Sequence, residues 1–103
     1  MIRLMVLYPA GEGRTFDMDY YLKTHIPLFQ NRMGAALRDL SVERGISGPT
    51  PGSPAPFVAL ATAAFDSVEA FAAAYAPHAA EILGDIPKYT NIQPVVQISQ
   101  VHE

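Results

Sequence analysis

Short apolar runs and helix-like stripes alternate along the 103 residues of the chain. Ile2 to Tyr8 is a run of large and branched side chains, which predicts a strand. Leu37 to Ile46 alternates between apolar and polar residues as a half-exposed strand does, and Phe57 to Phe65 is apolar throughout. Ile92 to Val101 predicts a last strand, with Pro94 near its start as an edge or a bulge allows.

The first helix is predicted to start at Asp17, a good N-cap, and to stop at Gly34. Pro27 lies inside this stretch, lacks a backbone donor and clashes with the carbonyl of Lys23. We therefore expect a kink or a break near His25, with the helix in two pieces. The residues of the predicted apolar stripe are Met18, Leu22, Ile26, Phe29 and Met33.

The second helix is predicted to begin at the box-like segment 66–69 and to end at Pro77. Pro77 also favours a short helical piece from His78 to Leu83, closed by Gly84. Segment 45–56 is dense in glycine and proline, which predicts a long hairpin loop between the second and third strands. The predicted inner stripe of the second helix is Val68, Phe71, Ala72 and Tyr75.

The order of elements is βαββαβ, which predicts an α+β, ferredoxin-like fold in a single domain over residues 1–103. Such a fold is a four-stranded antiparallel sheet with both helices on one face. The strands 2–8 and 57–65 are apolar on both faces, and Met5 and Leu7 point away from the helices. A second copy of the chain would cover that face, so we predict a homodimer formed through the sheet face.

Composition excludes several function classes. The chain is 50% hydrophobic and 17% charged, with a net charge of −3 and no basic patch, so we expect no nucleic-acid partner. Cysteine is absent, which excludes a disulfide, a thiolate metal site and a cysteine nucleophile. No apolar run approaches the roughly 18 residues of a membrane-spanning helix. We expect a cytoplasmic protein with no membrane partner.

His25 is the strongest candidate for a catalytic residue. It comes one residue before Ile26 in the apolar stripe and two before Pro27, where a kinked helix can aim the imidazole into a pocket between helix and sheet. An imidazole near its ordinary pKa is a natural general base at neutral pH. The alternative is a structural histidine that caps carbonyls freed by Pro27.

Phenols are the other candidates for the site. Tyr8 at the end of a buried strand, with Tyr20 and Tyr21 on the facing helix, can donate to a developing oxyanion or line an aromatic pocket. Tyr21 and His25 are four residues apart on one helix face and can touch. The alternative is that these tyrosines are core or rim aromatics. Phe29 is a further ligand-binding candidate from the apolar stripe, and Gln97 is an amide that the pattern places in a loop, at an edge or in the pocket.

His78 is also a ligand-binding candidate, in the first turn after Pro77. His78 and Glu81 have the spacing of a metal-ligand pair, but no HxH or HExxH motif accompanies them, so a solvated helix face is the favoured interpretation and we predict no metal site. The acidic residues are mostly assigned to helix caps and solvated strand faces. A paired-carboxylate hydrolase is therefore not predicted.

Several segments together resemble the EthD family. They are Tyr8-Pro9, residues 16–28, Tyr89-Thr-Asn91 and residues 94–98, of which 16–28 is the most specific. EthD-like proteins belong to the dimeric α/β-barrel superfamily. The resemblance implies a ferredoxin-like protomer whose sheet pairs with that of its mate to form a barrel. It also adds weight to His25, because His25, Pro27 and Leu28 match an H-x-P-L pattern.

The resemblance implies a single fold but several different activities. The family is named for a protein needed to degrade ethyl tert-butyl ether alongside a cytochrome monooxygenase system, and the superfamily includes cofactor-independent monooxygenases, isomerases, polyketide cyclases and haem-dependent enzymes. Our leading hypothesis is proton transfer, without a cofactor, on a compact apolar molecule such as an activated phenol or ketone, leading to isomerisation, cyclisation or monooxygenation. The second is a non-catalytic accessory protein of an oxidative degradation system. The third, haem binding, is disfavoured because neither His25 nor His78 has an axial-ligand context.

Overall fold

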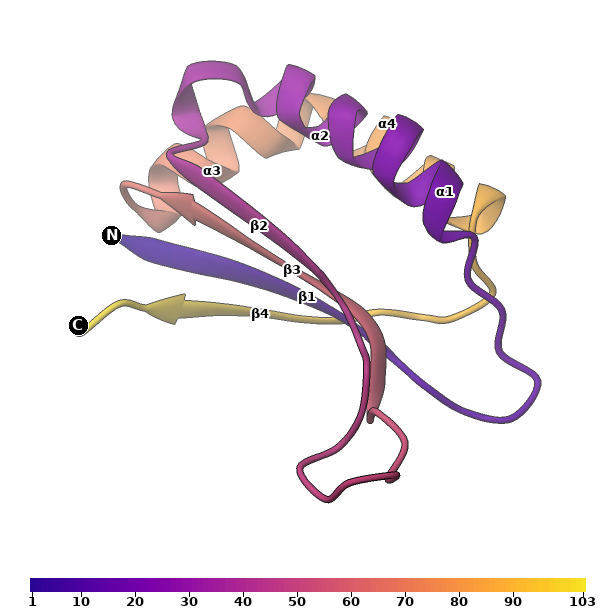
Figure 1. Cartoon of the computed structure of the whole chain (residues 1–103). Helices are drawn as coiled ribbons and strands as arrows, with labels where there is room; N and C mark the ends of the chain where they lie inside the picture. Colours follow the sequence, from indigo (N-terminus) through magenta and orange to yellow (C-terminus); the bar gives the residue numbers. More distant parts are fainter.

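The computed structural model describes residues 1–103 as a four-stranded sheet with helices on one face (Figure 1). The strands lie in the order β2-β3-β1-β4, and every pairing is antiparallel. This arrangement confirms the predicted ferredoxin-like α+β fold. The strands are β1 (Ile2–Pro9), β2 (Asp39–Arg44), β3 (Phe57–Phe65) and β4 (Val95–Gln100).

The first helical segment runs without a break along one side of the sheet. The N–H of Ile26 donates to the carbonyl of Tyr21, five residues back, which makes a π-helical turn. This wide turn leaves Pro27 in the first turn of the next helix, where a missing backbone N–H costs little. The irregularity predicted near His25 is therefore present as a π turn, but the predicted separation of the helix into two pieces is wrong. The parts are α1 (Met18–Tyr20), the π turn (Tyr21–His25) and α2 (Ile26–Met33).

The π turn also changes which side chains face the sheet. Leu22 is 47% exposed, so its predicted place in the apolar stripe is wrong. A stripe extrapolated at 3.6 residues per turn drifts off the buried face where the turn holds more residues. Gly34 ends the segment as predicted, with a φ of 56° that favours glycine. The buried residues are Tyr21, His25, Phe29 and Met33.

The second helical segment is longer than predicted. Gly84 does not adopt a positive φ, and the chain stays helical through it, so the predicted end at Gly84 is wrong. The segment ends in a tight turn that contains Pro87. Its parts are α3 (Val68–Tyr75), a 3₁₀ turn (Ala76–His78), α4 (Ala79–Asp85) and a second 3₁₀ turn (Ile86–Lys88). None of the helices is long and apolar enough to cross a membrane.

The side of α3 that packs on the core differs in part from the prediction. Phe71 and Tyr75 contact the core, but Val68 is 46% exposed and Ala72 is also exposed. Ala74 packs on the core beside Phe71 and Tyr75, so the buried face lies on the side of Phe71 away from Ala72. Ser67 is the N-cap, one residue after the predicted start of the box, and Val68 is the first helical residue.

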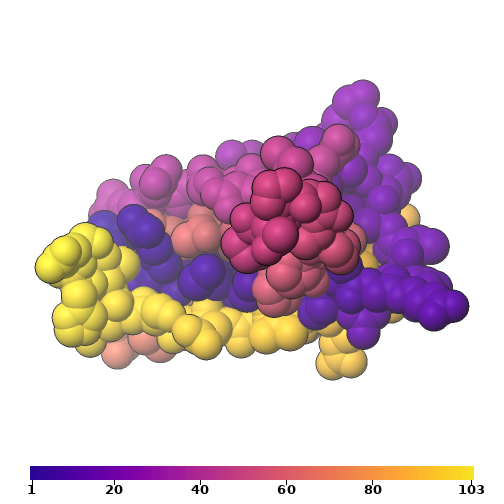
Figure 2. Space-filling model, turned by 60° about the horizontal axis from the view of Figure 1, so that its bottom comes forward, coloured from indigo at the N-terminus to yellow at the C-terminus, as the bar shows by residue number.

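The two faces of the sheet differ in what covers them. Every second side chain of β1 faces the helices, while Met5 and Leu7 lie on the opposite, outer face. Leu60 and Val95 are the cross-strand neighbours of Leu7, and Val95 is 53% exposed. The hairpin loop, residues 45–56, stands forward of this outer face (Figure 2). The outer face thus carries an apolar strip of Met5, Leu7, Leu60 and Val95 that the helices of this chain do not reach, with polar residues of β2 and β4 on either side.

Candidate functional site

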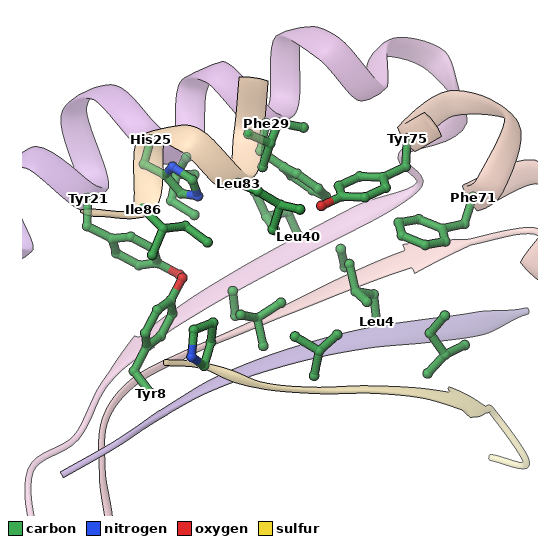
Figure 3. Close-up of a pocket in the computed structure, with 18 residues that line it drawn as sticks. Leu4, Tyr8, Tyr21, His25, Phe29, Leu40, Phe71, Tyr75, Leu83 and Ile86 are labelled. Carbon is green, nitrogen blue, oxygen red and sulfur yellow. The ribbon is translucent and has the colours of Figure 1, made fainter. Parts of the chain in front are cut away.

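A cavity of about 270 Å³ lies between the helices and the inner face of the sheet (Figure 3). It exists because β3 presents small side chains there: Ala61 and Ala63 line the cavity opposite Val6 and Leu4 of β1. No lysine, arginine, aspartate or glutamate lines it. The cavity opens toward α4 and the edge strand β4, where lining residues such as Leu83 and Val96 are more than half exposed. The walls therefore suit an uncharged, apolar ligand.

His25 extends from the π turn into this cavity, and a carboxylate hydrogen-bonds to the side of its ring that faces away from the cavity. Nδ1 of His25 lies 2.9 Å from Oδ2 of Asp85, and both side chains are less than 10% exposed. The hydroxyl of Tyr20 donates to the other carboxylate oxygen at 2.8 Å. Nε2 of His25 has no hydrogen-bond partner in the chain, and the ring lines the cavity. The ring thus hydrogen-bonds to Asp85 rather than to a carbonyl freed by Pro27.

The pKa values decide which atom of the pair carries the proton. Burial alone would raise the pKa of Asp85, but hydrogen bonds from His25 and Tyr20 and the charge of Lys88 bring it below its ordinary value. An ionised carboxylate only accepts hydrogen bonds, so the proton between the two groups sits on Nδ1. Burial lowers the pKa of His25, against the opposing effect of Asp85, so the ring is neutral at pH 7. Nε2 is therefore an unprotonated base that faces the cavity.

Aromatic rings enclose His25 and account for its burial. Tyr21 stacks on the imidazole with ring centroids 5.8 Å apart, and Tyr89 packs against it at 4.7 Å. The hydroxyls of Tyr8 and Tyr89 are 2.6 Å apart and share a hydrogen bond. Tyr8 and Tyr21 approach each other from the sheet and from the helix at one end of the cavity (Figure 3). This end holds a base and two phenols side by side.

The phenols at this end keep their protons. Burial raises the pKa of Tyr8, and burial together with the neighbouring Tyr8 raises the pKa of Tyr21 and of Tyr89 well above the ordinary range. A neutral phenol remains a hydrogen-bond donor at pH 7. When Tyr89 donates to the oxygen of Tyr8, the O–H of Tyr8 is free to point at a ligand oxygen.

The structure brings together four of the seven residues predicted for the site. Tyr8, Tyr21, His25 and Phe29 all line the cavity. Tyr20 does not line it and instead binds Asp85 from outside. The other two residues lie apart from the cavity: His78 is half-buried in the turn between α3 and α4, and Gln97 faces the outer side of the sheet, beside Met5.

Two residues that contact the predicted site residues were missed by sequence reasoning. Asp85 was not singled out among the acidic residues, and Tyr89 entered only within the family resemblance. Asp85 did carry a signal, because it is an acidic residue inside the apolar stretch from Ile82 to Pro87.

The pair with metal-ligand spacing, His78 and Glu81, does not form part of a metal site. Glu81 instead pairs with Arg32 at 2.7 Å. No three His, Asp or Glu side chains gather closely enough to hold a metal ion.

The fold and the site together define a ferredoxin-like protein with an apolar cavity whose polar groups gather at one end. A family model described as the EthD domain matches residues 10–94. The chain belongs to the EthD family. Among curated proteins, no sequence gives a significant match.

Solved structures agree with this assignment. An EthD-like protein from Ralstonia eutropha JMP134 is 46% identical, with a TM-score of 0.93 over 99% of this chain and 92% of that one. An EthD family protein from Bacillus halodurans C-125 is 24% identical, with a TM-score of 0.75 over 98% of both chains. A dimeric protein with a ferredoxin-like fold from Bacteroides fragilis NCTC 9343 is 13% identical, with a TM-score of 0.61 over 97% of this chain and 95% of that one. The last two likenesses show the fold alone.

Proposed function

We propose that this EthD-family protein binds a compact, largely apolar organic molecule in the cavity and transfers a proton on it without a cofactor. One observation carries this proposal. A neutral His25 is fixed through Nδ1 by the buried Asp85 and presents its unprotonated Nε2 to an apolar cavity. A base held in this way by a carboxylate is the arrangement that general base catalysis requires.

The chemistry follows from the positions of His25, Asp85 and the neighbouring tyrosines. Nε2 of His25 removes a proton from a carbon next to a carbonyl, and the electrons of the broken C–H bond move onto the carbonyl oxygen. The hydroxyl of Tyr8 donates to that oxygen as it becomes negative, while Tyr21 and Tyr89 hydrogen-bond to the oxygen of Tyr8. Asp85 stabilises the imidazolium until the proton returns to another atom of the ligand. Such enolisation is the first step of an isomerisation or a cyclisation of a ketone.

The experiment uses 2-tetralone, a neutral ketone with two rings, in D₂O. We expect the protein to bind it and to speed the exchange of its α-protons above the buffer rate, as followed by ¹H NMR. Binding measured by calorimetry with exchange at the buffer rate would instead favour a non-catalytic binding or accessory protein. If 2-tetralone and related neutral ketones and phenols all fail to bind, the proposed ligand class is wrong.

We also propose that the protein forms a homodimer through the outer face of the sheet. Met5, Leu7, Leu60 and Val95 lie together on that face without cover from the helices, as apolar residues at an interface do. The Bacteroides fragilis protein, whose fold is shared, is described as dimeric.

Leu7→Lys tests the dimer. Leu7 is on the inner strand β1 at the centre of this face, so the substitution would bury a lysine charge in an apolar interface at a cost of about 3–5 kcal/mol, or at least about 100-fold in the dimer dissociation constant. In sedimentation at micromolar concentration we expect a dimer for the wild type and a monomer of 11.2 kDa for the variant. Leu22→Lys, which places the same charge on the helical side, is the matched control and should stay dimeric. A monomeric wild type contradicts the proposal.

A further inference from the structure

Tyr75 is a polar side chain at the end of the cavity away from Tyr8. It is the last residue of α3 and stacks on Phe71, with ring centroids 5.1 Å apart and an angle of 23° between the rings. The stack fixes the direction of the ring. Figure 3 shows its hydroxyl pointing along the helical side of the cavity toward Leu83 and Leu40, in the direction of His25.

The hydroxyl of Tyr75 has no partner of its own. The Tyr8 and Tyr89 hydroxyls bind each other, and the Tyr20 hydroxyl binds Asp85, but no protein group accepts from or donates to Tyr75. Burial raises the pKa of Tyr75, so the phenol keeps its proton and remains a donor. No fully buried side-chain oxygen or nitrogen lacks a hydrogen-bond partner, so the hydroxyl of Tyr75 is accessible from the open cavity. Water or a ligand in the cavity is what this hydroxyl can bind.

The cavity has the length and the volume for a ligand that spans both ends. Leu4 lies below the Tyr75 end and Tyr8 at the His25 end, and four residues of extended strand cover about 13 Å. A protein cavity of about 150 Å³ takes up benzene. At about 270 Å³, this cavity has room for two rings.

We propose that Tyr75 is a second polar anchor, so that the ligand is a neutral molecule of about two rings with an oxygen at each end. One oxygen lies near His25 and Tyr8, and the other accepts from or donates to the hydroxyl of Tyr75. This inference rests on the proposed use of the cavity for apolar compounds and specifies which of them bind. The charge of the ligand follows from the lining, which offers no ionic partner.

The test compares two probes, 2-naphthol and 2,6-dihydroxynaphthalene, which differ by a hydroxyl at the far end. Their own fluorescence reports binding, and the chain contains no tryptophan to interfere. The measured quantity is the ratio of the affinity for the diol to the affinity for 2-naphthol. We expect this ratio to be about fivefold larger for the wild type than for Tyr75→Phe, which is the contribution of one neutral hydrogen bond. Tyr75→Phe keeps the ring and its stacking on Phe71, so only the hydroxyl changes.

Leu83→Ala is the control from another part of the cavity lining. It removes apolar area but no polar group and leaves the Phe71–Tyr75 stack in place, so the affinities for both probes should fall together and their ratio should stay at the wild-type value. If wild type and Tyr75→Phe have the same ratio, Tyr75 is only part of the wall and this inference is wrong, while the proposed function stands. If the wild type binds 2-tetralone but neither naphthol, this inference is wrong and the proposed function stands. If it binds none of the three, both are wrong.

Discussion

Replacing His25 by glutamine is expected to slow the protein-dependent exchange of 2-tetralone protons by about 10²–10⁴-fold, the usual contribution of a general base. Glutamine has no basic nitrogen, yet its amide can still donate to Oδ2 of Asp85. The variant therefore avoids leaving a buried carboxylate without a partner, which would destabilise the fold. Exchange rates by NMR and binding of 2-tetralone by calorimetry separate the loss of proton transfer from a loss of the cavity.

His102→Gln is the matched control for this substitution. His102 is exposed near the C-terminus and does not line the cavity, so its replacement should leave the exchange rate unchanged. If His25→Gln binds 2-tetralone and still exchanges its protons at the wild-type rate, His25 is not the base. The catalytic part of the proposed function would then be lost, and only the binding part would remain.

The second large effect is expected from Asp85→Asn, which should lower the exchange rate by about 10–100-fold, as the loss of a group that orients a histidine usually does. An amide can turn its NH₂ group toward Nδ1, which forces the histidine proton onto Nε2 and removes the base from the cavity. Asp85 acts through His25 and is therefore a positioning residue.

The pH profile distinguishes this role from a structural one. The wild-type rate should rise with pH as His25 loses its proton, with a midpoint below the ordinary pKa of 6.5 because burial lowers the pKa of the ring. Asp85 opposes that shift, since its hydrogen bond and its charge favour the protonated ring. Without the charge the pKa falls further, so the midpoint in Asp85→Asn should move to lower pH.

Glu81→Gln is the control for Asp85→Asn. It removes the same charge from the same helix, α4, but Glu81 pairs with the half-buried Arg32 and not with His25. Its rate and midpoint should match those of the wild type. An Asp85→Asn variant with a lower rate and an unmoved midpoint would show that Asp85 supports the fold and does not tune the base.

The elements of the fold were predictable because their signals are local. The apolar run from Phe57 to Phe65, the Asp17 cap and the stop at Gly34 all appear where they were predicted. The errors also have a local cause. The π turn before Pro27 kept the first helical segment whole and moved Leu22 outward, and the helical φ of Gly84 carried α4 on to Asp85. Neither choice can be made from periodicity, because both depend on packing against the sheet.

The candidate site was predictable only in part. His25 and Tyr21 share one face of the first helical segment, and Tyr8 ends the strand below them, so a local pattern was enough to nominate all three. Asp85 lies 60 residues from His25, and Tyr89 lies 81 residues from Tyr8. A hydrogen bond between residues so far apart in the sequence produces no periodic pattern from which it could be predicted.

The sequence by itself determined the order of the elements, the fold they form, the sheet face that lacks a cover and the histidine most suited to act as a base. Each of these follows from side-chain size and polarity at regular spacings, which act within one element at a time. Only the tertiary structure decided that Asp85 holds His25 as a neutral base, that the alanines of β3 open a cavity and that the hydroxyl of Tyr75 points along it. These features arise where two elements pack together. They depend on the size and the charge of the side chains that one element places against the other.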